Sequence, residues 1–467
     1  MQQARQNSAA RQQLPRNNAP AGARRPQGRV VGSPQADAVT GVPTRPNNGA
    51  ARAVPKQVGK PLGQQTEKTA VKAKKKKKVK DPNRVRFFSL QGRVDVPMLI
   101  IIMVLLVFGI TMMFSAGHAL SYSENNGDSF AYVTQQMKAA GLGLVAMFVL
   151  SFFDYRFLRH EFKLFGGKKS ITVTHLFLFF AMFLNLLTIP FGVAAVGGQK
   201  RWLPVPGLGQ FQPSDILKIA VIVYFAYYIQ KNSDKMRKFY DGIFIPGVML
   251  VIIILSMISQ MHLSFMVIIC VVFVAMLFTG GSNLKYLVPI CLLAVGVAVF
   301  AVMVLDIGYF KERIVFMDPL SDPGAGSYQN YQSALALGSG GIWGKGFGNS
   351  SQKYNYLPEA HNDFVYAILV EEFGLVGGLA VIVLFLIFVF RGFYIARRAE
   401  DKFGCLLATG ITFQIGLQAF LNLGVNLCCI PNTGISMPFF SYGGTALALQ
   451  LCEMGLLLSV SKRAKLS

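Results

Sequence analysis

The stretch "PMLIIIMVLLVFGITMMFSAG" (residues 97–117) decides the fold class, because it is almost entirely apolar and carries no charge. About 17–25 mostly apolar residues are enough to cross a bilayer as a helix. Backbone groups in lipid must bond internally, so such a run forms a helix rather than an open sheet. The strands of a membrane barrel would alternate in polarity, and this run does not.

Nine similar segments follow in a chain of 467 residues that is 52% apolar and only 15% charged. Soluble domains carry roughly 25% charged residues. We therefore expect an all-α polytopic membrane protein with ten transmembrane helices. The predicted spans are residues 97–117, 133–153, 171–191, 214–230, 243–258, 263–279, 286–307, 364–390, 403–427 and 445–460.

Positive charge between these spans predicts the topology. Basic clusters follow spans 2, 4, 8 and 10, and the segment before span 1 is basic as well. Because loops rich in Lys and Arg stay in the cytoplasm, both termini are expected there. Residues 308–362 then form a large extracytoplasmic loop between helices 7 and 8. Its Trp343, its tyrosines and its turn residues favour an ordered cap over the membrane face.

The segment 1–94 is expected to be a disordered basic cytoplasmic tail, and 95–463 the membrane domain. The tail holds 21 Lys and Arg against 3 Asp and Glu, so it accounts for +18 of the net charge of +24. Its few apolar residues cannot form a core. The run "KAKKKKKVK" (residues 72–80) favours attraction to anionic lipid. Docking of a partner protein is an alternative, and we expect no nucleic-acid partner.

Polar residues in the apolar segments are candidates for function. Asp215 and Lys218 lie three apart, which is also the spacing of a local ion pair. Asp363 and Glu371 are eight apart and are expected on one helical face. A stripe at i, i+4 spacing either joins helices or lines a wet groove. It consists of Gln414, Gln418, Asn422 and Asn426, and Gln450 and Glu453 lie near it in the next span.

The remaining patterns give weaker indications of function. The piece "GSGGIWGKGFGNS" (residues 338–350) follows no strand, lacks a GK[ST] ending and lies on the wrong side for ATP, so a nucleotide site is not expected. His262 and His361 lack the partners of a metal motif, and hydrogen-bonding roles are favoured. The six cysteines lack metal spacing and are expected to be apolar filler. A divalent cation on Asp322 or Glu359 stays open.

Three blocks in order resemble the SEDS family, the FtsW/RodA/SpoVE proteins: "RWLPVPGLGQFQPSDILK" from residue 201, "DPGAGSYQNYQSALALGSGGIWGKGFGNSSQKYNYLPEAHNDFVYAILVEEFGLVGG" from residue 322, and "NTGISMPFFSYGGTALAL" from residue 432. The resemblance implies a ten-span bundle that polymerises the lipid-linked disaccharide-peptide lipid II into peptidoglycan. It also implies a class B penicillin-binding protein, a transpeptidase, as partner. The essential aspartate of the D-P-x-G-x-x-Y-Q block falls on Asp322.

This resemblance makes Asp322 the candidate catalytic base of an inverting transfer that builds β-1,4 glycan strands. Lys200, Arg201, Lys345 or a divalent cation (Mg²⁺ or Mn²⁺) would balance the pyrophosphate. The sequence departs from the family pattern at two positions. Asp215 stands where the family commonly has Glu. His262 stands where the family often has Asp, and no role is transferred to it. The candidate substrate-binding residues are Lys200, Arg201, Trp202, Ser214, Lys218, Gln329, Lys345, Glu359, His361, Asp363, Gln418, Asn422 and Ser441.

Alternative functions are a lipid II flippase or transporter, and a noncatalytic divisome scaffold. A polymerase is favoured because its key carboxylate is expected outside, at head-group level. The expected location is the bacterial cytoplasmic membrane, and other divisome or elongasome membrane proteins are expected partners. A role in division, elongation or sporulation is not distinguished by these residues.

Overall fold

The fold is described from a computed structural model. The structure describes Phe87 and residues 92–163, 170–194, 200–205, 209–257, 260, 263–304, 328–432 and 434–465. All of them belong to one compact unit, Val79–Ser467. The predicted tail lies almost wholly outside the described residues, and so do Asp322 and His262.

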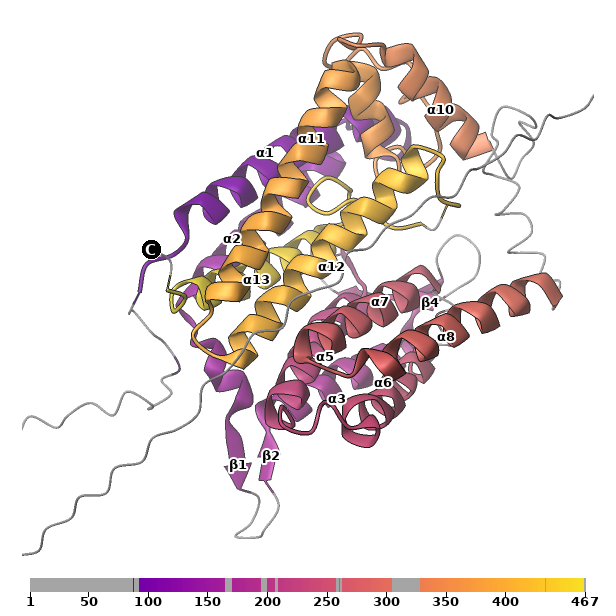
Figure 1. The fold of residues 1–467 in the computed structure, drawn as a ribbon. Coiled ribbons are helices and arrows are strands. Elements are labelled where there is room, and N and C mark those ends of the chain that lie inside the picture. Colours follow the sequence, from indigo (N-terminus) through magenta and orange to yellow (C-terminus); the bar gives the residue numbers. More distant parts are fainter. Residues whose placement is uncertain are drawn as a thin grey trace, which may run out of the picture. The chain divides into compact units, whose positions relative to one another are not determined.

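The described part is mostly helical, and each of the predicted apolar segments overlaps a helix (Figure 1). Within the described ranges, six helices are long and apolar enough to cross a membrane by length and composition. The helices are α1 (Val96–Glu124), α2 (Ala131–Phe152), α3 (Val173–Leu186), α4 (Thr188–Phe191), α5 (Pro213–Lys231), α6 (Ile245–Leu255), α7 (Leu263–Gly280), α8 (Leu284–Val304), α10 (Tyr328–Gly340), α11 (Val365–Arg398), α12 (Lys402–Asn426) and α13 (Gly444–Ser461).

Two small sheets within the described residues make the expectation of an all-α protein incomplete. β1 (Glu161–Lys163) pairs with β2 (Ser170–Thr172), and β4 (Lys200–Val205) lies between β3 (Val193–Ala194) and β5 (Gly209–Phe211). All pairs are antiparallel. A 3₁₀ turn (Tyr155–Arg159) and a π-helical turn (Tyr240–Phe244) complete the elements. The strands lie between helices, where the apolar pattern is interrupted.

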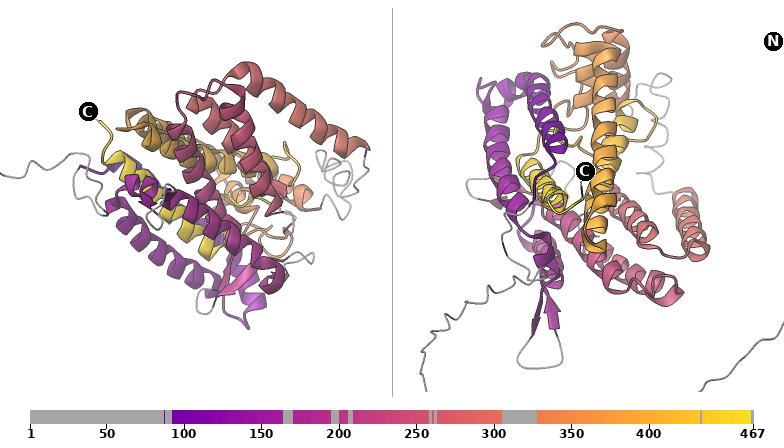
Figure 2. Two further views of the ribbon diagram at one scale, coloured as in Figure 1. Left: turned by 90° about the horizontal axis from the view of Figure 1, so that it is seen from below. Right: turned by 60° about the vertical axis from the view of Figure 1, so that its left-hand side comes forward.

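Helices α5, α12 and α13 are the most enclosed. α12 packs on α5, α7 and α11, and α13 packs along α2. The left view of Figure 2 shows α13, in yellow, beside the purple helices from the start of the coloured chain. Helices α2 and α3 bury few residues and leave large apolar side chains exposed, among them Phe148 and Phe179. An apolar exterior around a partly polar interior is what a bilayer-embedded bundle requires.

Ion pairs fasten the end of the bundle where α1 begins. Asp95 caps α1 by accepting from the Met98 amide at 2.8 Å, and its carboxylate also accepts Arg391 Nη2 at 2.6 Å and Nε at 3.0 Å. At the same end, Arg463 Nη2 lies 2.6 Å from Asp154 Oδ2. These contacts join the start of α1 to α11, and the end of α13 to the turn after α2. Arg391 and Arg463 therefore have a structural role at this end of the bundle.

Helix α11 is broken at Gly374, whose φ of 69° and ψ of −170° are not helical. A continuous helix would bond the carbonyls of Glu371 and Glu372 to amides four residues later. These carbonyls instead accept from the amides of Lys345 and Gly346, at 3.0 and 2.9 Å. The segment before α11 in the sequence therefore inserts into the backbone ladder of α11.

The amides beyond the break are satisfied in the same way. Leu375 N donates to Gly341 O at 2.9 Å, and Val376 N donates to Ile342 O at 3.2 Å. Only glycine fits at Gly374, because a Cβ there would lie 2.3 Å from the Ile342 carbonyl oxygen. Both sides of the break thus keep their backbone hydrogen bonds, which a helix at membrane depth requires. We refer to residues 341–346 as the inserted segment.

Candidate functional site

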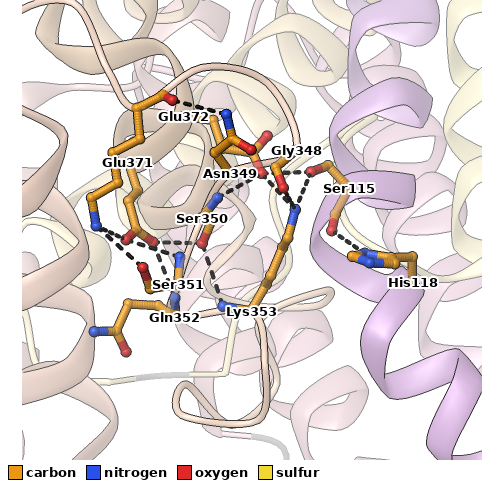
Figure 3. Close-up of polar contacts among 11 residues, drawn as sticks. Ser115, His118, Gly348, Asn349, Ser350, Ser351, Gln352, Lys353, Glu371 and Glu372 are labelled. Carbon is orange, nitrogen blue, oxygen red and sulfur yellow. Dashed lines mark hydrogen bonds and ion pairs between the residues drawn. The ribbon is translucent and has the colours of Figure 1, made fainter.

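The inserted segment is fastened by a buried network around Glu371 (Figure 3). The Glu371 side chain is fully buried and accepts Lys345 Nζ at 2.6 Å. Its oxygens also accept Ser339 Oγ at 3.1 Å, Ser350 Oγ at 2.5 Å and the amides of Ser351 and Gln352 at 3.2 and 3.3 Å. Five donors therefore stabilise one carboxylate. Asp363 precedes α11, so the prediction that it shares a helical face with Glu371 is wrong.

Glu372 forms the second half of this network. Its Oε1 lies 3.0 Å from Lys353 Nζ and accepts Ser115 Oγ of α1 at 2.6 Å. Lys353 also donates to the carbonyl of Gly348 at 2.6 Å, and its side chain is 1% exposed. A lysine this buried is stable as an ion only with its partners in place. The two pairs join α1, α11 and the loop between α10 and α11.

Lys345 was predicted to balance the charge of a pyrophosphate, but in the structure its own charge already has a partner. Its ammonium is paired with Glu371, and its side chain is 33% exposed. Lys353, Glu372 and Ser115 were not singled out from the sequence. The only local signal was the double acid "EE" within an apolar run, which requires nearby cations but does not say which ones.

Two of the predicted residues, Glu359 and His361, line one cavity of about 280 Å³. The other wall is the C-terminal end of α1, including Glu124. Glu359 has a φ of 55°, and its carboxylate accepts Asn362 Nδ2 at 2.5 Å. His361 stacks on Tyr132 with ring centroids 5.2 Å apart. Burial lowers the pKa of His361, although the charges of Glu359 and Glu124 oppose the shift, so burial favours the neutral imidazole.

The amide side chains of the stripe on α12 form hydrogen bonds with neighbouring segments of the chain rather than lining a wet groove. Asn422 Nδ2 donates to the carbonyls of Asp363 and Ile435, both at 2.8 Å. Asn426 Nδ2 donates to the Asp363 carbonyl at 2.9 Å, and Asn426 Oδ1 accepts the Ala367 amide at 3.1 Å. These bonds fix the entry into α11. Both asparagines are fully buried.

The other stripe residues have similar positions. Gln418 Nε2 donates to the Ser436 carbonyl at 3.0 Å. Gln414 Nε2 contacts Glu453 of α13 at 3.5 Å. The stripe therefore acts as the helix-joining element that was one of its two interpretations. The local ion pair expected for Asp215 and Lys218 is present at 2.9 Å, with both side chains more than nine-tenths buried.

The remaining predicted residues are spread over four places. Lys200, Arg201 and Trp202 lie on β4, with Lys200 exposed and Arg201 Nε donating to the Gln260 carbonyl at 3.0 Å. Gln329 on α10 accepts Asn432 Nδ2 at 2.7 Å. Ser214 lies beside Asp215, and Ser441 donates to the Asn362 carbonyl at 2.5 Å.

A metal centre has no support from the part of the chain that the structure describes. No group of three His, Cys, Asp or Glu side chains there could hold an ion. The described cysteines are free and mostly half-buried, and burial raises the pKa of the Cys428 thiol. Asp322, the predicted base, is outside the described residues, and α10 begins six positions after it, at Tyr328.

Comparison with known proteins identifies relatives over nearly the whole helical body. The family model FTSW_RODA_SPOVE, described as "Cell cycle protein", matches residues 96–466. "Probable peptidoglycan glycosyltransferase FtsW" of Geobacter sp. (strain M18) is 36% identical over 372 residues, covering 79% of this chain and 97% of that protein. "Stage V sporulation protein E" of Bacillus subtilis (strain 168) is 34% identical over 374 residues, with coverages of 79% and 98%.

Solved structures share the fold. A chain reported under "Structural coordination of polymerization and crosslinking by a peptidoglycan synthase complex" has a TM-score of 0.64 at 22% identity, covering 80% of this chain and 99% of that one. The rod shape determining protein RodA of Thermus thermophilus has a TM-score of 0.56 at 23% identity, with coverages of 80% and 98%. Given the family match from the start of α1 to beyond the end of α13, this chain belongs to the FtsW/RodA/SpoVE family of cell cycle proteins.

Proposed function

We propose that this protein is a peptidoglycan glycosyltransferase that polymerises lipid II into β-1,4 glycan strands, in cell division or cell-shape control. The observation that carries the proposal is the 36% identity to a protein named probable peptidoglycan glycosyltransferase FtsW, across 97% of that protein's length. The match extends from α1 to α13, so it includes the loop with Asp322 and both of its flanking helices.

The chemistry needs one base and stabilisation of a leaving pyrophosphate. The donor sugar is linked to its lipid by an α bond and the product bond is β, so a single displacement inverts the anomeric carbon. Asp322 takes the proton from the acceptor 4-hydroxyl as the new C–O bond forms and the bond to pyrophosphate breaks. Lys200 on β4, which is exposed, could balance the leaving group.

The structure supports this role by anchoring α10, the helix that follows Asp322 in the sequence. Downstream of Asp322, Ser333 on α10 donates to the Asn426 carbonyl at 2.9 Å, and Ser339 donates to Glu371. A Cβ on Gly340 would lie 2.2 Å from the Val370 carbonyl oxygen, so α10 approaches α11 closely. Rigid support of this kind holds a base within reach of its proton.

The finer organisation is part of the same proposal. We infer ten spans, cytoplasmic termini and an extracytoplasmic loop at 308–362, from the distribution of basic residues. We infer a class B penicillin-binding protein as partner, because the related fold with the TM-score of 0.64 comes from a complex that couples polymerization to crosslinking. The tail 1–94 is assigned to anionic lipid.

The test is polymerisation of purified lipid II by the full chain with its cognate transpeptidase. Asp322→Ala and Asp322→Asn should lose glycan synthesis by about 100-fold or more, the range of a missing general base. Asp234→Asn, an exposed carboxylate in the turn after α5, is the matched control and should retain activity. Full polymerisation by both Asp322 variants would refute the assignment.

Two measurements separate the alternatives. Lipid II translocation across vesicles that persists in Asp322→Ala, with no polymerisation by the wild type, would favour the transporter. Deletion of residues 1–86 that abolishes function in cells while leaving polymerisation intact would favour the scaffold.

A further inference from the structure

The cavity beside Glu359 and His361 has a chemical character that the polymerisation reaction does not use. It is about 280 Å³ and lies between the C-terminal end of α1 and residues 353–361. Side chains of Ala, Leu and Pro form much of its wall, and Glu124, Lys353, Glu359 and His361 supply the ionisable groups. The space suits a small aliphatic group with one polar end.

The charge available to a ligand in this cavity is negative. Lys353 is the cation in the wall, and its charge is paired with Glu372 at 3.0 Å. Glu359 accepts from the Asn362 amide, and Glu124 accepts from the Tyr132 hydroxyl, so both contacts are with neutral groups. Neither carboxylate forms an ion pair within the described ranges. Two carboxylates therefore remain to attract a cation.

His361 provides an independent sign of a ligand. The residue is 6% exposed, and its Nδ1 has no hydrogen-bond partner among the described residues. Its ring stacks on Tyr132 and lies 5.5 Å from Tyr442, which holds it at the cavity wall. A buried polar atom without a partner costs free energy, and a donor from a ligand at this position would remove that cost. A neutral imidazole can accept one hydrogen bond.

We propose that this cavity binds an aliphatic primary ammonium carried by the peptide of the lipid-linked substrate, an inference that rests on the proposed function. An ammonium has three N–H donors and no acceptor, which matches two carboxylates and one imidazole nitrogen. The Ala, Leu and Pro side chains of the wall suit the alkyl chain of an amine, which a divalent metal ion lacks. Peptides that are later cross-linked through amide bonds must carry a free amine as the nucleophile.

The test compares lipid II with a derivative whose peptide amine is acetylated, using the full chain and its transpeptidase. Acetylation removes the charge, so the wild type should show a KM about tenfold higher with little change in kcat. Glu359→Gln and Glu124→Gln should each raise the KM for the free amine and make the protein less sensitive to acetylation. Asp234→Asn is the control and should keep the full preference.

Glu359→Gln and Glu124→Gln are both measured, so that the comparison of the two lipids still stands if one variant misfolds. Equal KM values of the wild type for both lipids would overturn the ammonium site while confirming polymerisation. Absence of polymerisation with either lipid would count against the proposed function, and binding of the two lipids to the full chain would then decide the cavity proposal. Equal dissociation constants would overturn it, and preference for the free amine that Glu359→Gln removes would support it.

Discussion

Lys353→Met should be among the most destabilising single changes in the described part of the chain. The variant leaves the Glu372 carboxylate fully buried with Ser115 Oγ and the Ser350 amide as its donors, at 2.6 and 3.4 Å. It also removes the donor to the Gly348 carbonyl. Removing one member of a buried ion pair costs about 3–5 kcal/mol. We expect a loss of unfolding free energy in that range, measured by denaturant unfolding in bicelles.

The second ion pair supplies the comparison. Lys345→Met also removes a cation, but Glu371 keeps four donors and Lys345 is partly exposed, so about 1–2 kcal/mol is expected. The double variant Lys353→Met/Glu372→Gln should recover at least about 2 kcal/mol relative to the sum of its single changes.

Hydrogen exchange of residues 341–353 gives a local measurement. The amides of Lys345 and Gly346 bond to α11, so they should exchange faster in Lys353→Met than in the wild type. The reasoning is refuted if the two single lysine variants are equally stable, or if the double variant is additive.

Three further predictions concern other parts of the fold. Gly374→Ala should lower the free energy of unfolding by at least about 2 kcal/mol, because Gly374 has a positive φ and a Cβ there would contact backbone atoms. Gly141→Ala on α2 should be neutral or stabilising, because a Cβ there meets nothing within 4 Å. Denaturant unfolding of both variants measures the difference. Asn426→Ala should cost about 1–3 kcal/mol, since it removes a donor to the buried carbonyl of Asp363, and thermal unfolding measures it. The lowered pKa of His361 means that the unfolded chain binds a proton first as pH falls, so stability should be full above about pH 6.5 and decline below it. His361→Gln should flatten that decline, and an unchanged pH profile would contradict it.

Much of the candidate site could be located but not interpreted from the sequence. Glu359 and His361 were singled out, and they do line one cavity. Asn422 was singled out as a substrate residue, yet its side chain is occupied by backbone carbonyls. An i, i+4 stripe shows which residues share a face of a helix, but not what lies opposite that face. Asn422 and Asn426 face the backbone at the entry into α11, whereas Gln414 faces Glu453 of α13, and this follows only from the packing.

The sequence by itself determined where the apolar helices are, because membrane helices are set by local runs of apolar residues and by the charges at their ends. It did not predict α10, a helix of low hydrophobicity within the expected loop at 308–362. It also placed the local pair of Asp215 and Lys218, three residues apart. The tertiary structure decided which distant partners meet. Glu371 pairs with Lys345, which is 26 residues away in the sequence, and Glu372 pairs with Lys353, which is 19 residues away. The break at Gly374 is likewise stable only because the inserted segment supplies the backbone partners that α11 gives up.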